Sequence, residues 1–127
     1  MIWTFLLVGL GAALGAWMRW GIGAWFNPLL PILPLGTIIA NLFGGFLMGI
    51  TIELTKSHAL LSESARLALT TGFLGALTTF STFSGEMVML ILKHEYIWAV
   101  AMAAIHVGGS VALTMVGMYL VKLLLGW

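Results

Sequence analysis

The stretch TTGFLGALTTFSTFSGE, residues 70–86, lies inside an apolar segment that extends from about residue 65 to residue 92. It contains three glycines, seven hydroxyl side chains and one carboxylate. Groups that break a helix or form hydrogen bonds are tolerated at membrane depth only where protein or water satisfies them. The stretch therefore predicts a part of the segment where the helix is irregular or where polar groups are paired with protein or water. Whether lipid surrounds the segment depends on the rest of the chain.

The composition indicates a membrane protein. Of the 127 residues, 61% are hydrophobic and only 7% are charged, whereas soluble domains have about 25% charged residues. A chain of this size cannot bury so much apolar surface in water, so we expect membrane lipid around it. The chain has no cysteine, which excludes thiol chemistry, and its net charge of +1 gives no reason to expect a nucleic-acid partner.

Four apolar segments are each long enough to span a bilayer, which needs about 20 residues. The segments are residues 2–25, 35–54, 65–92 and 97–125. Three prolines in NPLLPILP end the first segment. We predict an all-α integral membrane fold with four transmembrane helices in a single domain, residues 1–127, and a third helix that is broken in mid-membrane.

Basic residues are nearly balanced between the two sides. One side carries Lys56, Arg66 and Lys122, and the other carries Lys93 and Arg19. This bias is weak under the positive-inside rule. It permits insertion in both orientations and an antiparallel homodimer, but one fixed orientation remains open.

Several polar side chains lie on or near faces of small residues, and for Arg19 and Asn41 two roles remain open. Arg19 shares a face with Gly11 and Gly15, where it could pair at a vestibule or extend to the headgroups. Asn41, near the middle of the second segment, could connect helices or line a pore. In the fourth segment, Ser110 could bond to its own helix and His106 is expected to be an ordinary packed histidine.

A helix break around Gly72 to Thr78 would expose carbonyls at the end of one half-helix and amides at the start of the next. The carbonyls could form a cation site if two copies met, and the amides suit an anion. Thr78 or Thr79 could cap the second half. The alternative is an unbroken, glycine-rich packing helix, and the excess length of the segment favours the break.

The second half of this segment combines hydroxyl groups with a phenylalanine pair. Ser81 and Thr82 add donors, and Phe80 and Phe83 share a face because they are three residues apart. Positively polarised ring edges beside such donors could line an anion path, although core packing is the commoner role for such rings. In a proton or cation pathway Glu86 would be the carrier, whereas in an anion pathway it would repel the anions. Both roles remain open.

At this point the chain resembles the small fluoride channels called Fluc or CrcB. The resemblance rests on four motifs: GTIIANLFGGFLMG (36–49), TTGFLGALTTFSTFSGE, GAWMRW and HVGGS. It implies an antiparallel homodimer of dual topology with two fluoride pores, which passively exports fluoride across the bacterial inner membrane and thereby confers fluoride resistance.

The resemblance also implies roles for single residues. A structural sodium ion at the dimer interface would be held by the backbone carbonyls of Gly75 and Thr78 from each chain. The remaining roles fall on the residues of the fluoride pore, Asn41, Phe80, Ser81, Thr82, Phe83 and Ser110, and on accessory positions, Arg19, Glu86 and His106. His106 stands near a position where some family members have tyrosine, which would change the donor chemistry.

The main alternative is a proton-coupled small multidrug exporter, another short four-helix dimer of dual topology. Such an exporter needs a carboxylate in its first helix, where this chain has none, so Glu86 would have to serve. A non-transporting membrane assembly protein would explain the glycines but not the polar cluster. An enzyme is not expected, because no nucleophile–base pair is evident from the spacing.

Overall fold

The computed structural model describes residues 1–56 and 61–126, and this part of the chain contains no β-strand. Its helical elements group into four stretches that are long and apolar enough to cross a membrane. These stretches are Ile2–Leu29, Leu35–Lys56, Glu63–Leu92 and Tyr96–Leu125. The structure thus confirms the prediction of an all-helical chain with four potential membrane spans.

The first two stretches are joined by a proline-rich turn. Helix α1 (Ile2–Phe26) leads into a 3₁₀ turn, η1 (Asn27–Leu29), and α2 (Leu35–Lys56) follows. Because prolines cannot continue the helical hydrogen-bond pattern, the chain turns here. The Gly36 backbone N–H donates to Asn27 Oδ1 over 2.7 Å, and this bond ties the end of the first stretch to the start of α2.

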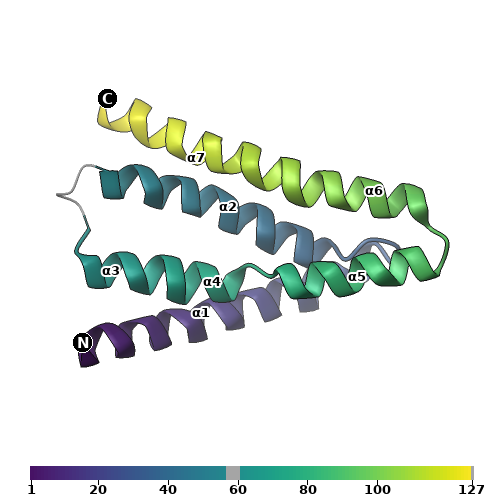
Figure 1. Ribbon diagram of the computed structural model, residues 1–127, viewed down its shortest axis with the longest axis horizontal. Helices are drawn as coiled ribbons and strands as arrows, with labels where there is room; N and C mark the ends of the chain where they lie inside the picture. The colour runs from purple at the N-terminus through teal and green to yellow at the C-terminus, as the bar shows by residue number, and fades with distance from the viewer. Residues whose placement is uncertain (57–60, 127) are drawn as a thin grey trace.

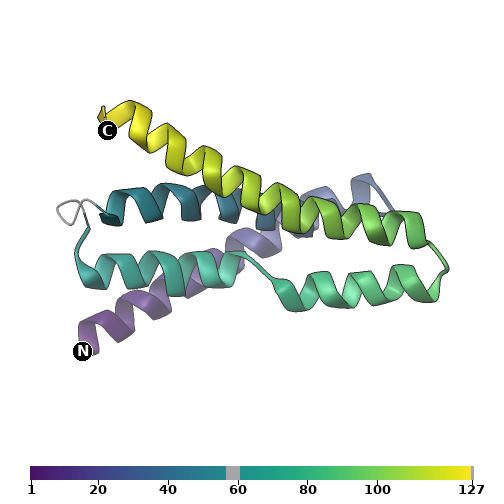
Figure 2. The ribbon, with the colours of Figure 1, turned by 45° about the horizontal axis from the view of Figure 1, so that its top comes forward.

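The third stretch consists of several shorter elements. They are α3 (Glu63–Leu67), the π-helical η2 (Ala68–Leu74), α4 (Gly75–Leu77) and α5 (Phe80–Leu92). Thr78 and Thr79, between α4 and α5, have extended backbone angles. Figure 2 shows this connection as a short non-helical link between two helices whose axes are offset.

These two extended residues overlap the interruption that the sequence suggested, from Gly72 to Thr78, only at Thr78. Gly72 and Gly75 stay within helical turns. A Cβ atom on Gly72 would lie 2.5 Å from the Val8 carbonyl oxygen of α1. Gly72 is therefore required for the close approach of α1 rather than for an irregular backbone.

The fourth stretch contains α6 (Tyr96–Ala104), the π-helical η3 (Ile105–Gly109) and α7 (Ser110–Leu125). The four stretches lie roughly along one axis (Figure 1). The start of α1 and the end of α7 lie at one end of the molecule, and the turn between α5 and α6 lies at the other.

Glycines allow α2 and α7 to pack with their backbones in near contact. A Cβ atom on Gly49 would lie 1.9 Å from the Thr114 carbonyl oxygen, and one on Gly117 would lie 2.2 Å from the Phe46 carbonyl oxygen. Close packing through small residues is the usual means by which helices associate in lipid. It places the polar residues of α2 directly beside those of η3 and α7.

Candidate functional site

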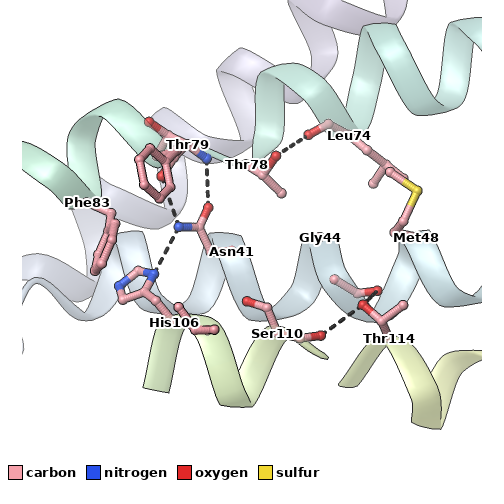
Figure 3. A pocket seen from close by; sticks show the side chains of 13 residues that line it. Asn41, Gly44, Met48, Leu74, Thr78, Thr79, Phe83, His106, Ser110 and Thr114 are labelled. Atoms are coloured by element: carbon pink, nitrogen blue, oxygen red, sulfur yellow. Dashed lines mark hydrogen bonds between the residues drawn. The ribbon is translucent and has the colours of Figure 1, made fainter. Parts of the chain in front are cut away.

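The extended residue Thr79 is held by the side chain of Asn41 from α2 (Figure 3). The Thr79 backbone N–H donates to Asn41 Oδ1 over 2.7 Å, and Asn41 Nδ2 donates to the Thr79 carbonyl oxygen over 3.0 Å. In a continuous helix the same N–H would bond to the carbonyl of Gly75. Asn41 therefore gives the Thr79 N–H an acceptor in place of the one that the extended conformation removes, and it donates an additional hydrogen bond to the Thr79 carbonyl oxygen.

Thr79 also forms the N-terminal cap of α5. Its Oγ1 accepts a hydrogen bond from the Thr82 backbone N–H over 3.1 Å and donates to Thr82 Oγ1 over 2.9 Å. Threonine is a favoured N-cap because its hydroxyl satisfies one of the free amides in the first turn. Of the two capping candidates seen in the sequence, the structure selects Thr79. Thr78 instead ends α4, with its backbone N–H bonded to the Leu74 carbonyl.

Asn41 also contacts His106, the histidine that the sequence suggested to be an ordinary packed residue. Asn41 Nδ2 lies 3.0 Å from His106 Nδ1. The His106 side chain is buried, and its Nε2 atom has no hydrogen-bond partner among the described residues. His106 is therefore part of the polar cluster that surrounds Thr79.

The two phenylalanines of α5 lie beside this cluster but differ in their exposure. The ring centroids of Phe80 and Phe83 are 5.5 Å apart, and that of Phe83 lies 4.5 Å from the His106 ring. Phe83 is buried, whereas Phe80 is 77% exposed within a single chain. The predicted pairing of the two rings is thus present, with one ring packed in the core and the other presented outward.

A cavity of about 320 Å³ joins these groups. Its lining includes most of the pore candidates from the sequence together with residues of the interrupted helix: Asn41, Thr78, Thr79, Phe80, Phe83, His106, Ser110 and Thr114. The hydrogen-bonding groups are amides, hydroxyls and an imidazole, and the rest of the lining is apolar. Such a lining suits a small ligand that is recognised by neutral donors.

Arg19 and Thr82 lie at a second cavity, of about 490 Å³, between α1, α2 and the start of α5. Thr79 lines both cavities. The pair formed by Asn41 and Thr79 therefore stands where the two cavities adjoin. Ser81 is exposed and lines neither cavity, and its Oγ lies 3.4 Å from Thr79 Oγ1.

Glu86 lies one turn beyond the phenylalanine pair and is bound by a threonine that the sequence analysis missed. Thr37 Oγ1 donates to Glu86 Oε1 over 2.6 Å, and Glu86 Oε2 is buried without a partner among the described residues. Thr37 precedes Asn41 by four residues and therefore lies on the same face of α2. That spacing was the available signal for a second polar contact on this face.

Gly75 and Thr78, the two candidates for a cation site, lie at the start of α4 and directly after its end. Gly75 is exposed, and a Cβ atom there would meet only the Thr70 carbonyl oxygen, 3.5 Å away. The end of a helix presents carbonyl oxygens with partial negative charge. The two residues are thus adjacent to an open face of the chain.

Comparisons with known proteins identify the family. The model of the CrcB-like protein family (Camphor Resistance) matches residues 6–118. A fluoride-specific ion channel FluC from Nitrosospira multiformis is 49% identical over 121 residues, which cover 95% of this chain and 94% of that protein. The protein of the same name from Ralstonia pickettii is 50% identical over 118 residues, 93% of this chain and 94% of that protein.

These matches cover nearly all of the chain and confirm the resemblance that the sequence motifs indicated. The relatives are named as ion channels, and the four long apolar helices fit a multi-pass membrane protein. The chain therefore belongs to the CrcB family, a family of ion channels rather than enzymes.

Proposed function

We propose that this protein is a fluoride-selective channel that passively exports fluoride from the bacterial cytoplasm across the inner membrane. The observation that carries this proposal is the cavity at the interrupted helix, where Asn41, Ser110 and the two phenylalanines meet. The names of the close relatives support the choice of fluoride as the ion.

The lining of this cavity suits an anion that must enter and leave quickly. Conduction requires binding strong enough to replace water and weak enough to allow release. Amide and hydroxyl donors together with the positively polarised edges of phenylalanine rings meet this need, since none of them carries a full charge. Arg19, in the neighbouring cavity, would attract the anion to an entrance without holding it at the narrowest part.

A second copy of the chain, antiparallel to the first, would complete the pathway. Phe80 is a large apolar ring that a single chain leaves 77% exposed, and Ser81 beside it is also exposed. Both would be covered if two chains met along α5. The interruption of the third helix at Thr78 and Thr79 would then lie in mid-membrane in each chain, and the dimer would contain two pores.

A structural sodium ion would fit at the centre of such a dimer. Sodium is a hard cation that prefers oxygen ligands, and the carbonyls of Gly75 and Thr78 belong to the last helical turn before the extended link and to the link itself. The absence of a side chain at Gly75 leaves room for a partner to approach. These carbonyls would hold the ion, which would fix the two chains together at their interrupted helices.

The proposal is tested by ion efflux from liposomes that contain the purified protein. Fluoride is expected to leave rapidly while chloride is retained, and equal passage of the two ions would refute selectivity. Replacement of Phe80 or Phe83 by Ile is expected to slow fluoride efflux without dissociating the dimer. If neither substitution changes the efflux, the phenylalanines do not belong to the pathway.

The same assay distinguishes the proton-coupled exporter. An exporter that used Glu86 would need a carboxylate free to exchange protons and cationic substrates, whereas Oε1 of Glu86 is engaged by Thr37. It would transport an organic cation only in the presence of a proton gradient. A channel is expected to conduct fluoride down its own gradient with no proton gradient imposed.

A further inference from the structure

We propose that Gly44 of α2 is a positioning residue for the cation site: the space that glycine leaves there accommodates the Thr78 methyl group, and this contact fixes the Thr78 carbonyl toward the cation. The proposal rests on the sodium site proposed above and adds to it a residue that does not touch the ion. It follows from the contacts that hold Thr78 on the side of α2 and on the side of its own helix.

The Thr78 side chain occupies the space beside Gly44 (Figure 3). A Cβ atom on Gly44 would lie 2.2 Å from Thr78 Cγ2, whereas carbon atoms in contact lie about 3.5–4.0 Å apart. Gly44 is also buried, so the region offers no outward path for an added atom. Every side chain other than that of glycine would therefore displace the Thr78 methyl group.

The Thr78 hydroxyl keeps this methyl group from rotating away. Thr78 Oγ1 donates to the Leu74 carbonyl oxygen over 2.8 Å, and the Thr78 backbone N–H donates to the same oxygen over 3.0 Å. Threonine is stiff about its first side-chain torsion, and a rotation that moved the methyl group would move the hydroxyl off its acceptor. An atom added at Gly44 must therefore break this bond or shift the Thr78 backbone.

The direction of the Thr78 carbonyl follows from its peptide unit. This carbonyl and the Thr79 N–H belong to one planar trans peptide, in which the two groups point in opposite directions. The Thr79 N–H donates to Asn41 Oδ1 of α2 over 2.7 Å, so the Thr78 carbonyl points away from Asn41. This carbonyl accepts no hydrogen bond from any of the described residues.

A cation is the partner that fits this carbonyl. A carbonyl group at membrane depth needs a partner, because lipid supplies none. The Gly75 carbonyl, at the start of α4, has lost its usual helical donor as well, since the Thr79 N–H is bound to Asn41. Oxygen atoms of this kind are the ligands that hard cations prefer. Asn41 and Gly44, three residues apart on one face of α2, thus fix the peptide that carries one of these ligands.

Sodium binding can be measured without transport. Purified protein in detergent is titrated with sodium chloride against choline chloride at constant ionic strength, and the Tm is recorded at each step. A ligand that binds only the folded state raises the Tm, so the wild-type Tm should rise with sodium. Gly44→Ala is expected to move the midpoint of this rise to an about tenfold higher sodium concentration, a coupling typical of residues in contact. An unchanged midpoint in folded Gly44→Ala would overturn the proposal.

A second substitution moves the methyl group to the other side of the contact. Thr78→Ser keeps the hydroxyl for the Leu74 carbonyl and removes Cγ2. Combined with Gly44→Ala, it restores the number of carbon atoms between α2 and Thr78, and volume-conserving changes are tolerated best. The double variant should return the midpoint to within about threefold of the wild type. A double variant that binds sodium as weakly as Gly44→Ala would show that the contact with the methyl group is not the cause.

Gly49→Ala is the matched control on the same helix. A Cβ atom on Gly49 would lie 1.9 Å from the Thr114 carbonyl oxygen of α7 and so would not press on the third stretch. This variant should lower the Tm at every sodium concentration without moving the midpoint, and added Thr78→Ser should not restore the Tm. An equal shift of the midpoint by Gly49→Ala would mean that any loosening of the helices weakens sodium binding, and the specific role of Gly44 would be refuted.

The outcomes distinguish this proposal from the one on which it rests. If the wild-type Tm does not respond to sodium, the sodium site is wrong and the role of Gly44 falls with it, while fluoride efflux from liposomes tests conduction separately. If the wild type responds and folded Gly44→Ala responds equally, only the role of Gly44 is refuted. Should Gly44→Ala fail to fold, recovery of a folded, sodium-responsive protein by added Thr78→Ser supports the proposal, and a lack of recovery overturns it.

Discussion

The Asn41 side chain of α2 stabilises the extended backbone of Thr79, whose N–H has no acceptor within its own stretch of helix. The sequence placed this amide near the middle of an apolar segment and left two roles open, a connection between helices and a pore lining. The structure shows the connection: the backbone N–H and carbonyl of Thr79 are both paired with Asn41. The partner lies 38 residues away in the chain, so no local pattern could reveal it.

Asn41→Ala is expected to destabilise the protein because it leaves the Thr79 N–H and carbonyl without these partners. The N–H would be left unpaired, at a cost of roughly 1–3 kcal/mol, whereas the carbonyl oxygen keeps its hydrogen bond within α5. Thermal unfolding in detergent, followed by tryptophan fluorescence, should show a clearly lower Tm. Thr70→Val is the control, since the Thr70 hydroxyl donates only to the Arg66 carbonyl of its own helical turn. Equal Tm values for the two variants would contradict the role given to Asn41.

Thr37 donates a hydrogen bond to the Glu86 carboxylate, and the sequence analysis did not identify this partner. We expect Thr37→Val and Glu86→Leu each to change stability, and the double variant to differ from the sum of the two. Hydrogen bonds to charged groups contribute about 1.5–3 kcal/mol, so the coupling energy should be of this order. Unfolding of all four proteins in a double-mutant cycle measures it. Additive effects would mean that the bond does not stabilise the fold.

At the scale of the elements, the sequence located the irregular backbone of the third stretch but began it too early: of the suggested residues, Gly72 to Thr78, only Thr78 is extended, and Thr79 is extended beyond them. Glycine is the usual signal for an irregular backbone, which is why Gly72 attracted attention. In the structure the extended residues are threonines, and Thr79 is held there by its cap and by Asn41. Gly72 instead permits α1 to approach. Spacing in one segment cannot distinguish these uses, because the distinction depends on which helix lies alongside.

Glycine packing between α2 and α7 makes a sharp prediction. Gly49→Ala would place a Cβ atom 1.9 Å from the Thr114 carbonyl oxygen, so the two helices must separate. Overpacking of this kind typically costs about 1–3 kcal/mol, and a lower Tm is expected.

Gly9→Ala is the matched control in α1, since a Cβ atom there meets nothing within 4 Å. It should be neutral or stabilising by about 0.5–1 kcal/mol, because alanine favours helix more than glycine does. Equal destabilisation by Gly49→Ala and Gly9→Ala would show that helix propensity, rather than contact between helices, determines the effect.

For the whole molecule, the composition and the lengths of the four apolar segments were enough to predict four apolar helices, since lipid permits few other arrangements of so apolar a chain. Composition alone does not determine how the chain is oriented. The start of α3 and the turn between α5 and α6 lie at opposite ends of the molecule (Figures 1 and 2). A label at each position therefore reports one side of the membrane.

The proposed dual topology can be tested because the natural chain has no cysteine. Glu63→Cys at the start of α3 and Glu95→Cys in the turn between α5 and α6 each introduce one reactive thiol. With nearly balanced basic residues, half of the chains should insert in each direction. A membrane-impermeant maleimide added to intact cells should then label about half of each variant, and permeabilisation should expose the rest. Full labelling of one variant with full protection of the other would show a fixed orientation and exclude the antiparallel dimer.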